Sequence, residues 1–224
     1  MYKGIIFDLD GTLVDSLDDL ANSLNAALAE ASLSPRGRDE VRLMIGNGMA
    51  ILVARAIEGL GLDEAEAARI KSAVEADYKL HSLDRTRPYA GIDELLSQLR
   101  REGSRLAVLS NKPDSFAASI VASLFPDRSF DLVRGQLPEV PTKPDPRTAL
   151  EIIHGWGLDP EEIAIVGDSA VDMETARNAG AAGLGAAWGF RGRKELEAAG
   201  ALAVFDRPSD AADWLAGATQ ITLG

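Results

Sequence analysis

Apolar positions along the chain follow two different rhythms. Short continuous apolar runs are typical of strands that are buried on both faces of a parallel sheet. Between them lie stretches whose apolar residues recur at helical spacing. The runs are 4–7, 106–109, 130–133, 163–166 and 201–205, and the helical stretches are 92–101, 114–124, 146–156, 170–179 and 209–215. This alternation predicts an α/β fold whose parallel sheet is covered by helices on both faces.

An unusually long segment separates the first two predicted core strands. A strand-helix-strand unit takes about 30 residues, whereas Asp10 and Ser110, which close these strands, lie a hundred positions apart. The pattern between them is helical almost throughout, with expected helices at 17–31, 41–45, 49–60 and 64–80. We therefore predict a helical cap of residues 16–88 inserted into a core of residues 1–15 and 89–224. Such an insertion lies over the carboxyl ends of the strands, where open α/β sheets bind ligands.

Composition narrows the class of protein. The 224 residues are 46% hydrophobic and 26% charged, which fits a globular chain and excludes a disordered one. The absence of cysteine excludes disulfides, thiolate zinc sites and cysteine nucleophiles. A net charge of −12 repels nucleic acids and anionic membranes. With no apolar run of 18 residues and no charged leader before the first strand, we expect a cytoplasmic protein with neither kind of partner. The oligomeric state stays open.

The first apolar run ends in two carboxylates, Asp8 and Asp10, followed by Gly11. Two acids two residues apart at a strand end can supply a nucleophile and a proton donor, and glycine lets the backbone approach a phosphate. The same residues also fit a simple turn that Asp8 caps. A calcium loop requires glycine at its sixth position and glutamate at its twelfth. Counted from Asp8, glycine comes fourth and the twelfth residue is Asp19, so the spacing disfavours calcium.

Hydroxyl, amide and ammonium groups follow later strands. Ser110 and Asn111 come directly after the run 106–109, where a hydroxyl and free helix-entry amides suit a phosphate oxyanion. The alternative is that Ser110 caps the following helix. Lys143 precedes Pro144, which favours an extended backbone and holds the lysine on a rigid loop. A lone loop lysine is ordinarily solvated, but its place between core elements of an acidic chain favours anion binding.

Two further carboxylates follow the run 163–166. Asp168 stands where this strand ends, and Mg²⁺ prefers one or two carboxylates together with phosphate oxygens and water. Ser169 and Asp172 have the spacing of a capping box, which accounts for Asp172 by local helix-end hydrogen bonds. Capping does not account for Asp168, which is therefore the better metal candidate.

Together the four motifs resemble those of the haloacid dehalogenase-like hydrolase superfamily, and the resemblance covers almost the whole chain. Segments 45–49 and 87–91 are most similar to phosphoglycolate phosphatases. The resemblance implies a Rossmann-like core with an inserted α-helical cap, Mg²⁺ as the cofactor, Asp8 as the nucleophile and Asp10 as the general acid and base. The implied catalytic set is Asp8, Asp10, Ser110 and Lys143, the metal set is Asp8, Asp10, Asp168 and Asp172, and the substrate-binding candidates are Gly11, Asn111, Gly46, Asn47 and Gly48.

The activity that the resemblance implies is hydrolysis of a small phosphorylated metabolite such as phosphoglycolate through an aspartyl phosphate. Asp10 favours phosphoester hydrolysis, because dehalogenases and phosphonate hydrolases of similar sequence generally lack this second acid. The alternatives are a pyrophosphatase, a sugar-phosphate or nucleotide phosphatase of the same superfamily, and a noncatalytic protein that binds metal or phosphate.

Three glycine-rich or aromatic segments have two interpretations each. Residues 183–189 resemble a dinucleotide-binding loop, but the third glycine comes one residue late, so we interpret them as strand and loop packing. Residues 188–190 either border the active-site cleft or pack in the core. Gly46 and Gly48 either meet the substrate or form a plain interhelical turn.

Overall fold

The computed structural model describes residues 2–126 and 130–217, so the outer ends of the predicted core, residues 1 and 218–224, lie outside the described residues. Its main feature is a six-stranded parallel sheet in the order β5-β4-β1-β6-β7-β8. The strands are β1 (Gly4–Phe7), β4 (Arg105–Pro113), β5 (Leu132–Gln136), β6 (Ile163–Gly167), β7 (Ala182–Ala186) and β8 (Ala203–Phe205). The predicted fold class is confirmed.

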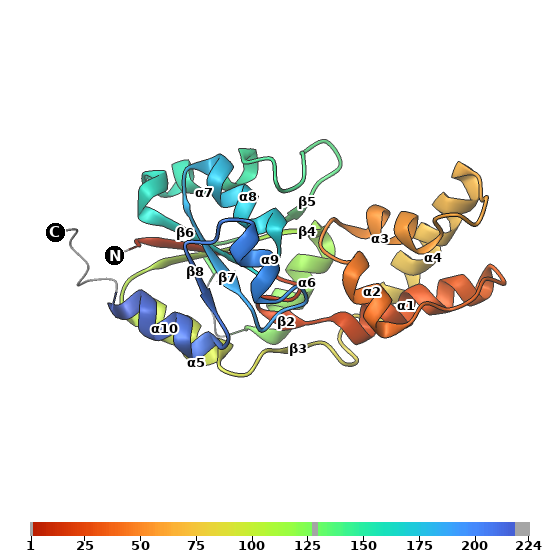
Figure 1. Ribbon diagram of the computed structural model, residues 1–224, viewed down its shortest axis with the longest axis horizontal. Helices are drawn as coiled ribbons and strands as arrows, with labels where there is room; N and C mark the ends of the chain where they lie inside the picture. The colour runs from red at the N-terminus through yellow and green to blue at the C-terminus, as the bar shows by residue number, and fades with distance from the viewer. Residues whose placement is uncertain (1, 127–129, 218–224) are drawn as a thin grey trace.

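Helices cover both faces of the sheet because successive strand residues point to opposite sides. Ile5 and Phe7 belong to one core cluster with residues of α5, α6 and α10, whereas Ile6 packs among residues of α7 and α8. Figure 1 shows α7 and α8 above the sheet and α5 and α10 below it. These helices are α5 (Ile92–Arg101), α6 (Asp114–Leu124), α7 (Arg147–Trp156), α8 (Ala170–Ala179), α9 (Arg193–Ala198) and α10 (Pro208–Gly217).

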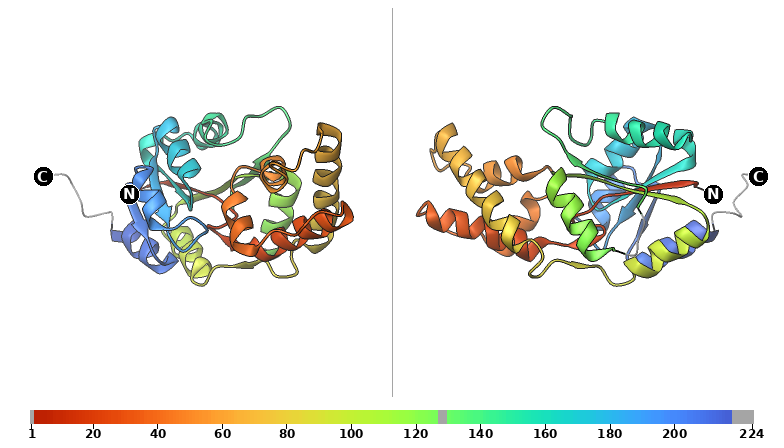
Figure 2. Two further views of the ribbon diagram at one scale, coloured as in Figure 1. Left: turned by 45° about the vertical axis from the view of Figure 1, so that its right-hand side comes forward. Right: turned by 180° about the vertical axis from the view of Figure 1, so that it is seen from behind.

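Four helices between β1 and α5 lie beyond the carboxyl ends of the strands, within the residues 16–88 predicted as the cap (Figures 1 and 2). They are α1 (Leu17–Glu30), α2 (Arg38–Met44), α3 (Met49–Ala56) and α4 (Glu64–His81). The chain enters and leaves the cap through β2 (Val14–Asp15) and β3 (Arg87–Pro88), which pair antiparallel. Within the described ranges, no helix combines the length and the apolar character that a bilayer span requires.

The strand β7 confirms the interpretation of residues 183–189 as strand and loop packing, and an added Cβ on Gly183 or Gly185 would stand 3.1 Å from Met173 or Leu196. Glycine therefore allows α8 and α9 to approach this strand closely, at the expense of a recognisable apolar run. The helix α9 has six residues and was not predicted, because so short a segment carries too little periodicity. The strand β5 begins at Leu132, two residues later than predicted.

A buried carboxylate joins the first helix of the cap to the segment through which the chain leaves the cap. Asp19, near the start of α1, is 1% exposed. Its oxygens accept hydrogen bonds from the backbone amides of Arg85 and Thr86 and from the Thr86 hydroxyl, at 2.7 to 3.0 Å. The segment that leaves the cap is thus bound to the helix that enters it.

We predict that Asp19→Ala lowers the free energy of unfolding by roughly 3 kcal/mol, because it leaves buried donors without an acceptor. Urea denaturation measures this loss. Asp18→Ala is the matched control, since Asp18 makes an exposed ion pair with Arg38 and its removal costs less than about 1 kcal/mol. Equal losses in the two variants would show that Asp19 does not fasten the connections.

Candidate active site

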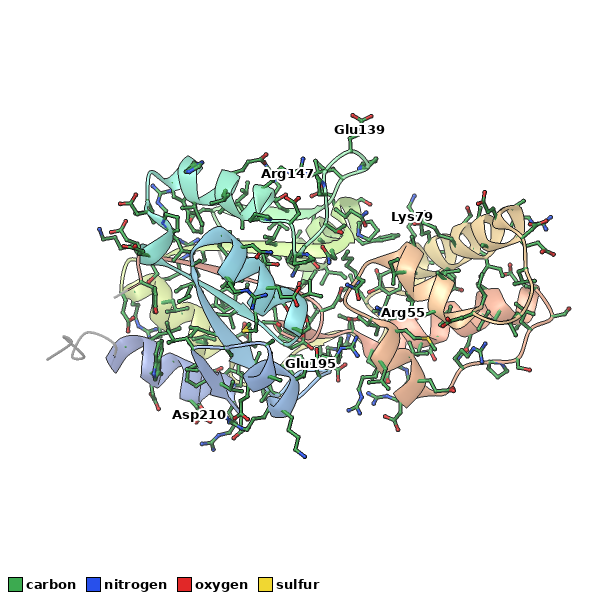
Figure 3. All side chains as sticks on the ribbon, turned by 45° about the horizontal axis from the view of Figure 1, so that its top comes forward. Arg55, Lys79, Glu139, Arg147, Glu195 and Asp210 are labelled. Carbon is green, nitrogen blue, oxygen red and sulfur yellow. The ribbon has the colours of Figure 1, made fainter. Side chains whose placement is uncertain are left out.

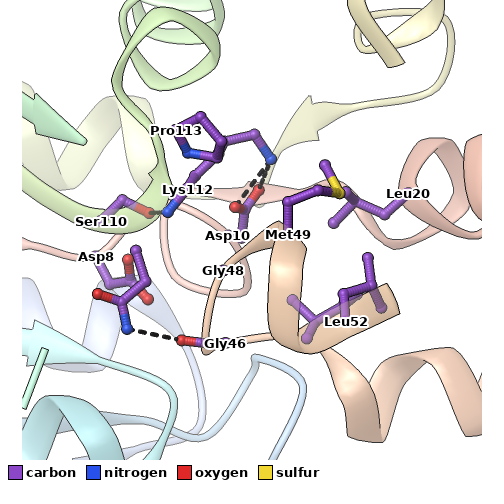
Figure 4. Close-up of a pocket in the computed structure, with 12 residues that line it drawn as sticks. Asp8, Asp10, Leu20, Gly46, Gly48, Met49, Leu52, Ser110, Lys112 and Pro113 are labelled. Atoms are coloured by element: carbon purple, nitrogen blue, oxygen red, sulfur yellow. Dashed lines mark hydrogen bonds and ion pairs between the residues drawn. The ribbon is translucent and has the colours of Figure 1, made fainter. Parts of the chain in front are cut away.

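Three neighbouring strands bring the predicted motifs to one edge of the sheet. Strand β1 lies between β4 and β6, and Asp8 and Asp168 directly follow β1 and β6. Ser110 was predicted to close its strand, but β4 continues to Pro113, so Ser110 reaches the same edge from inside β4. Lys143 reaches the same place from the loop between β5 and α7. The pocket in Figure 4 lies where this edge faces the cap.

The lysine of the β5–α7 loop bridges two buried carboxylates. Lys143 Nζ lies 2.9 Å from Asp8 Oδ1 and 2.6 Å from Asp172 Oδ1. Burial raises the pKa of Asp8 to about 6, although Lys143 opposes the rise. Burial alone would lower the pKa of Lys143, but Asp172 and Asp8 raise it above its ordinary value, so the ammonium ion persists at neutral pH.

Asp8, Asp168 and Asp172 form a group that fits a metal ion. All three are buried, and one carboxylate oxygen from each lies within 4.8 Å of the others. Burial raises the pKa of Asp168 well above its ordinary value, and the charges of Asp172 and Asp8 add to the rise. Such crowding of oxygen ligands is stable only with positive charge nearby, and oxygen is the ligand that hard cations prefer.

Asp172 has two partners. Its Oδ2 accepts hydrogen bonds from the Ser169 backbone amide and hydroxyl, at 3.2 and 2.7 Å, while Oδ1 binds Lys143. The predicted local role at the start of α8 is therefore present together with a position in the carboxylate group.

The Asp10 carboxylate lies outside the carboxylate group. Its Oδ1 accepts a hydrogen bond from the Ser16 hydroxyl at 2.5 Å, and its two oxygens lie 2.9 and 3.0 Å from Lys112 Nζ. The structure therefore places this side chain in the pocket, as predicted for an acid and base, but does not bring it together with the other three predicted metal ligands.

Asn111 joins three parts of the site. Its Oδ1 accepts a hydrogen bond from the Lys143 backbone amide at 2.8 Å, and its Nδ2 donates to the carbonyls of Lys143 and Gly46 at 3.1 Å. Ser110 is 5% exposed and lines the pocket, and its hydroxyl accepts a hydrogen bond from the Lys112 amide. Asn111 therefore holds the β5–α7 loop that carries Lys143 and also contacts the cap.

Two glycines let the backbone pack against Asp168. Gly11 has φ +84°, and a Cβ there would lie 2.4 Å from Asp168 Oδ2. A Cβ on Gly189 would lie 2.3 Å from Asp168 Cβ, and the next residue, Phe190, donates its amide to Asp168 Oδ2 at 2.7 Å. The segment 188–190 therefore borders the site. Gly11 contacts Asp168 and is not among the residues that line the pocket.

The turn between α2 and α3 reaches the pocket, beside residues of α1 and α3. Gly46 and Gly48 line it, but Asn47 does not, since its side chain accepts a hydrogen bond from Arg55 within the cap at 2.9 Å. Gly48 has φ +87°, and a Cβ there would lie 2.9 Å from the Asn111 carbonyl oxygen. The two glycines thus belong to the site, whereas Asn47 supports the turn.

Lys112 and Arg191 are two polar residues of the region that were not predicted from the sequence. Lys112 follows Ser110 and Asn111 directly, but nothing in the sequence indicates its pairing with Asp10 across a hundred positions. Arg191, after β7, donates hydrogen bonds to the carbonyls of Leu43 and Ile45 at 2.9 and 2.7 Å. In the sequence, only its position next to segment 188–190, which was expected to border the cleft or the core, points to this region.

Comparison with known proteins identifies the class. The sequence model of the haloacid dehalogenase-like hydrolase family matches residues 5–186. A phosphoglycolate phosphatase of Rhodospirillum rubrum is 37% identical over 96% of this chain and 91% of its own. Phosphoglycolate phosphatase 1 of Pseudomonas aeruginosa is 36% identical over 89% and 75%. The crystal structure of a predicted phosphoglycolate phosphatase from Haemophilus somnus superposes with a TM-score of 0.88, covers 98% of both chains and is 33% identical.

The chain belongs to the haloacid dehalogenase-like hydrolase family. Within that family it is a phosphatase, similar to the phosphoglycolate phosphatases. The family resemblance inferred from the four motifs is confirmed.

We predict that Asp168→Asn raises the melting temperature of the metal-free protein at neutral pH. The amide of Asn keeps an acceptor for the Phe190 amide. It removes the Asp168 carboxyl group, whose raised pKa shows that its charged form is unfavourable in these surroundings. We also predict that Mg²⁺ raises the melting temperature of the wild type and does not raise that of this variant. Calorimetry with and without Mg²⁺ measures both effects.

The control for this prediction is Asp39→Asn, on the exposed start of α2. It is expected to keep the Mg²⁺-dependent rise. A wild-type rise that persists undiminished in Asp168→Asn would contradict the metal assignment.

Proposed function

We propose that this phosphatase is a Mg²⁺-dependent hydrolase of a small phosphomonoester, phosphoglycolate or a close analogue, and acts through a phosphorylated Asp8. The observation that carries the proposal is the position of Asp8, buried in the pocket, 2.9 Å from Lys143 and within the group formed with Asp168 and Asp172. The names of the relatives support the choice of substrate.

The reaction has two steps. Ionised Asp8 attacks phosphorus, and the new P–O bond forms as the bond to the leaving alkoxide breaks. Asp10 donates its proton to that alkoxide. Water then attacks the aspartyl phosphate and gives a proton back to Asp10. The P–O bond to Asp8 breaks, which releases inorganic phosphate and restores the carboxylate.

The remaining residues bind and orient the phosphoryl group. Lys143 supplies positive charge beside Asp8, and Ser110 offers its hydroxyl at the same strand edge, so most of the rate acceleration comes from positioning and electrostatics. Asp8, Asp168 and Asp172 would hold Mg²⁺. When bound, the ion supplies charge that lets a phosphate dianion approach the carboxylates.

Residues 16–88 are proposed to act as a separate cap domain, and residues 1–15 with 89–224 as the catalytic core. The two chain connections through β2 and β3 favour a cap that rocks against the core and excludes water when closed. The predicted cytoplasmic location, and the predicted absence of nucleic-acid and membrane partners, belong to the same proposal.

A substrate panel tests the proposal. Purified protein is assayed with phosphoglycolate, pyrophosphate, a sugar phosphate and a nucleoside monophosphate, with Mg²⁺ and with a chelator. We expect the highest kcat/KM for phosphoglycolate and loss of turnover with the chelator. A higher kcat/KM for pyrophosphate, the sugar phosphate or the nucleoside monophosphate would show that phosphoglycolate is not the preferred substrate. Absence of turnover throughout would favour the noncatalytic alternative.

We predict that Asp8→Asn lowers kcat by at least about a thousandfold, because the amide is not a nucleophile. Steady-state kinetics measure the loss, and calorimetry verifies that the variant folds. Asp39→Asn again serves as the exposed control and is expected to keep wild-type turnover. Near-normal activity of folded Asp8→Asn would exclude the covalent mechanism.

We predict that Gly48→Val impairs turnover of phosphoglycolate more than phosphorylation of Asp8 by acetyl phosphate. The new side chain meets the Asn111 carbonyl and prevents the turn from seating on the core. Gly61→Val is the matched control, because Gly61 also has positive φ but has no neighbouring atom within 4 Å of an added Cβ. Equal losses in the two reactions would mean that the turn does not select the substrate.

A further inference from the structure

Lys112 is a buried cation that the mechanism above does not use. It lies on β4, is 5% exposed, and contacts both oxygens of Asp10. Its ammonium group also stands 4.6 Å from the centre of the Tyr78 ring of α4, so it touches the core and the cap together. Among the described residues that line the pocket, Lys112 alone carries a positive charge (Figure 4).

The two lysines of the site divide between the two catalytic carboxylates. Lys143 pairs with Asp8, where phosphorus is attacked, and Lys112 pairs with Asp10, where the leaving oxygen receives its proton. A substrate bound for this reaction therefore places its phosphoryl group beside Lys143. Its leaving part lies beside Lys112.

The rest of the pocket wall offers the leaving part few charged partners. The cap contributes the apolar side chains of Leu20, Met49 and Leu52. A carboxylate that enters such a space loses its water and regains little unless it meets a cation. A neutral group of the same size loses much less on entry.

We propose that Lys112 recognises a second negative group on the leaving part of the substrate, a carboxylate one carbon from the ester oxygen, and thereby selects short phosphorylated hydroxy acids. This inference rests on the proposed function and assigns its substrate class to one residue. Charge-assisted hydrogen bonds to an ammonium group provide the preference. The apolar cap residues close the space around the short carbon chain.

A residue that only positions Asp10 would behave differently. Loss of that role slows hydrolysis of every phosphomonoester, since all of them need the same acid. Loss of carboxylate recognition slows only substrates that carry the carboxylate, mainly through KM. The ratio of kcat/KM values for two substrates that differ only in this group separates the roles, because effects through Asp10 cancel in the ratio.

The experiment compares phosphoglycolate with phosphoglycolamide, its neutral amide of the same shape. The enzymes are wild type, Lys112→Gln, Lys112→Met and Lys112→Arg. Gln retains a donor for Asp10, Met retains the chain length, and Arg retains the charge. Lys79→Gln, at an exposed position on α4 (Figure 3), controls for the change in net charge. Calorimetry shows which of the neutral variants, Lys112→Gln and Lys112→Met, fold. One folded neutral variant is sufficient for the comparison.

We expect wild type and Lys79→Gln to prefer phosphoglycolate, and the folded neutral variants to lose at least tenfold of that preference, with part of it restored in Lys112→Arg. An unchanged ratio in a folded neutral variant, or a wild type without preference, would overturn the role of Lys112. Failure of wild type to hydrolyse either ester would instead overturn the proposed function, so the two failures are distinguishable.

Discussion

The crowding of carboxylates around Lys143 is the constraint on which the site depends. Four carboxylates stand with two ammonium groups at one edge of the sheet, and the two unbalanced negative charges match one divalent cation. Burial raises the pKa of Asp8 and of Asp168, and the charge of Lys143 opposes both rises without cancelling them. A bound cation would restore that balance and would favour the entry of a phosphate dianion, so metal binding and substrate binding are expected to be linked.

Glycine makes this density of charge sterically feasible. A Cβ on Gly167 would lie 2.2 Å from Asp172, and a Cβ on Gly11 or Gly189 would lie 2.4 or 2.3 Å from Asp168. Side chains at these positions would push the carboxylates apart and would separate the first motif from the segment after β7. The parallel sheet brings the motifs to one edge, and the glycines allow their backbones to meet there.

The sequence predicted the residues that follow strands, because strand ends in a parallel sheet share one edge whatever the details of packing. Asp8, Asp168 and Lys143 were found in this way. Lys112 and Arg191 were missed because their roles arise from partners in distant elements, Asp10 and the end of α2, and no local pattern encodes such pairs. The family resemblance implied Asn47 as a substrate-binding residue, but Arg55 binds its side chain within the cap.

Side chains of the core bind the cap through its backbone carbonyls, whereas cap side chains line the pocket. Asn111 and Arg191, both on the core, donate to the backbone carbonyls of Gly46, Leu43 and Ile45. Backbone acceptors are present whatever side chains the cap carries, so these contacts join the cap to the core without depending on the identity of the cap side chains. The side chains of α1 and α3 are therefore free to shape the pocket wall. Substitutions there are expected to change which leaving group fits while the seat of the cap on the core is retained.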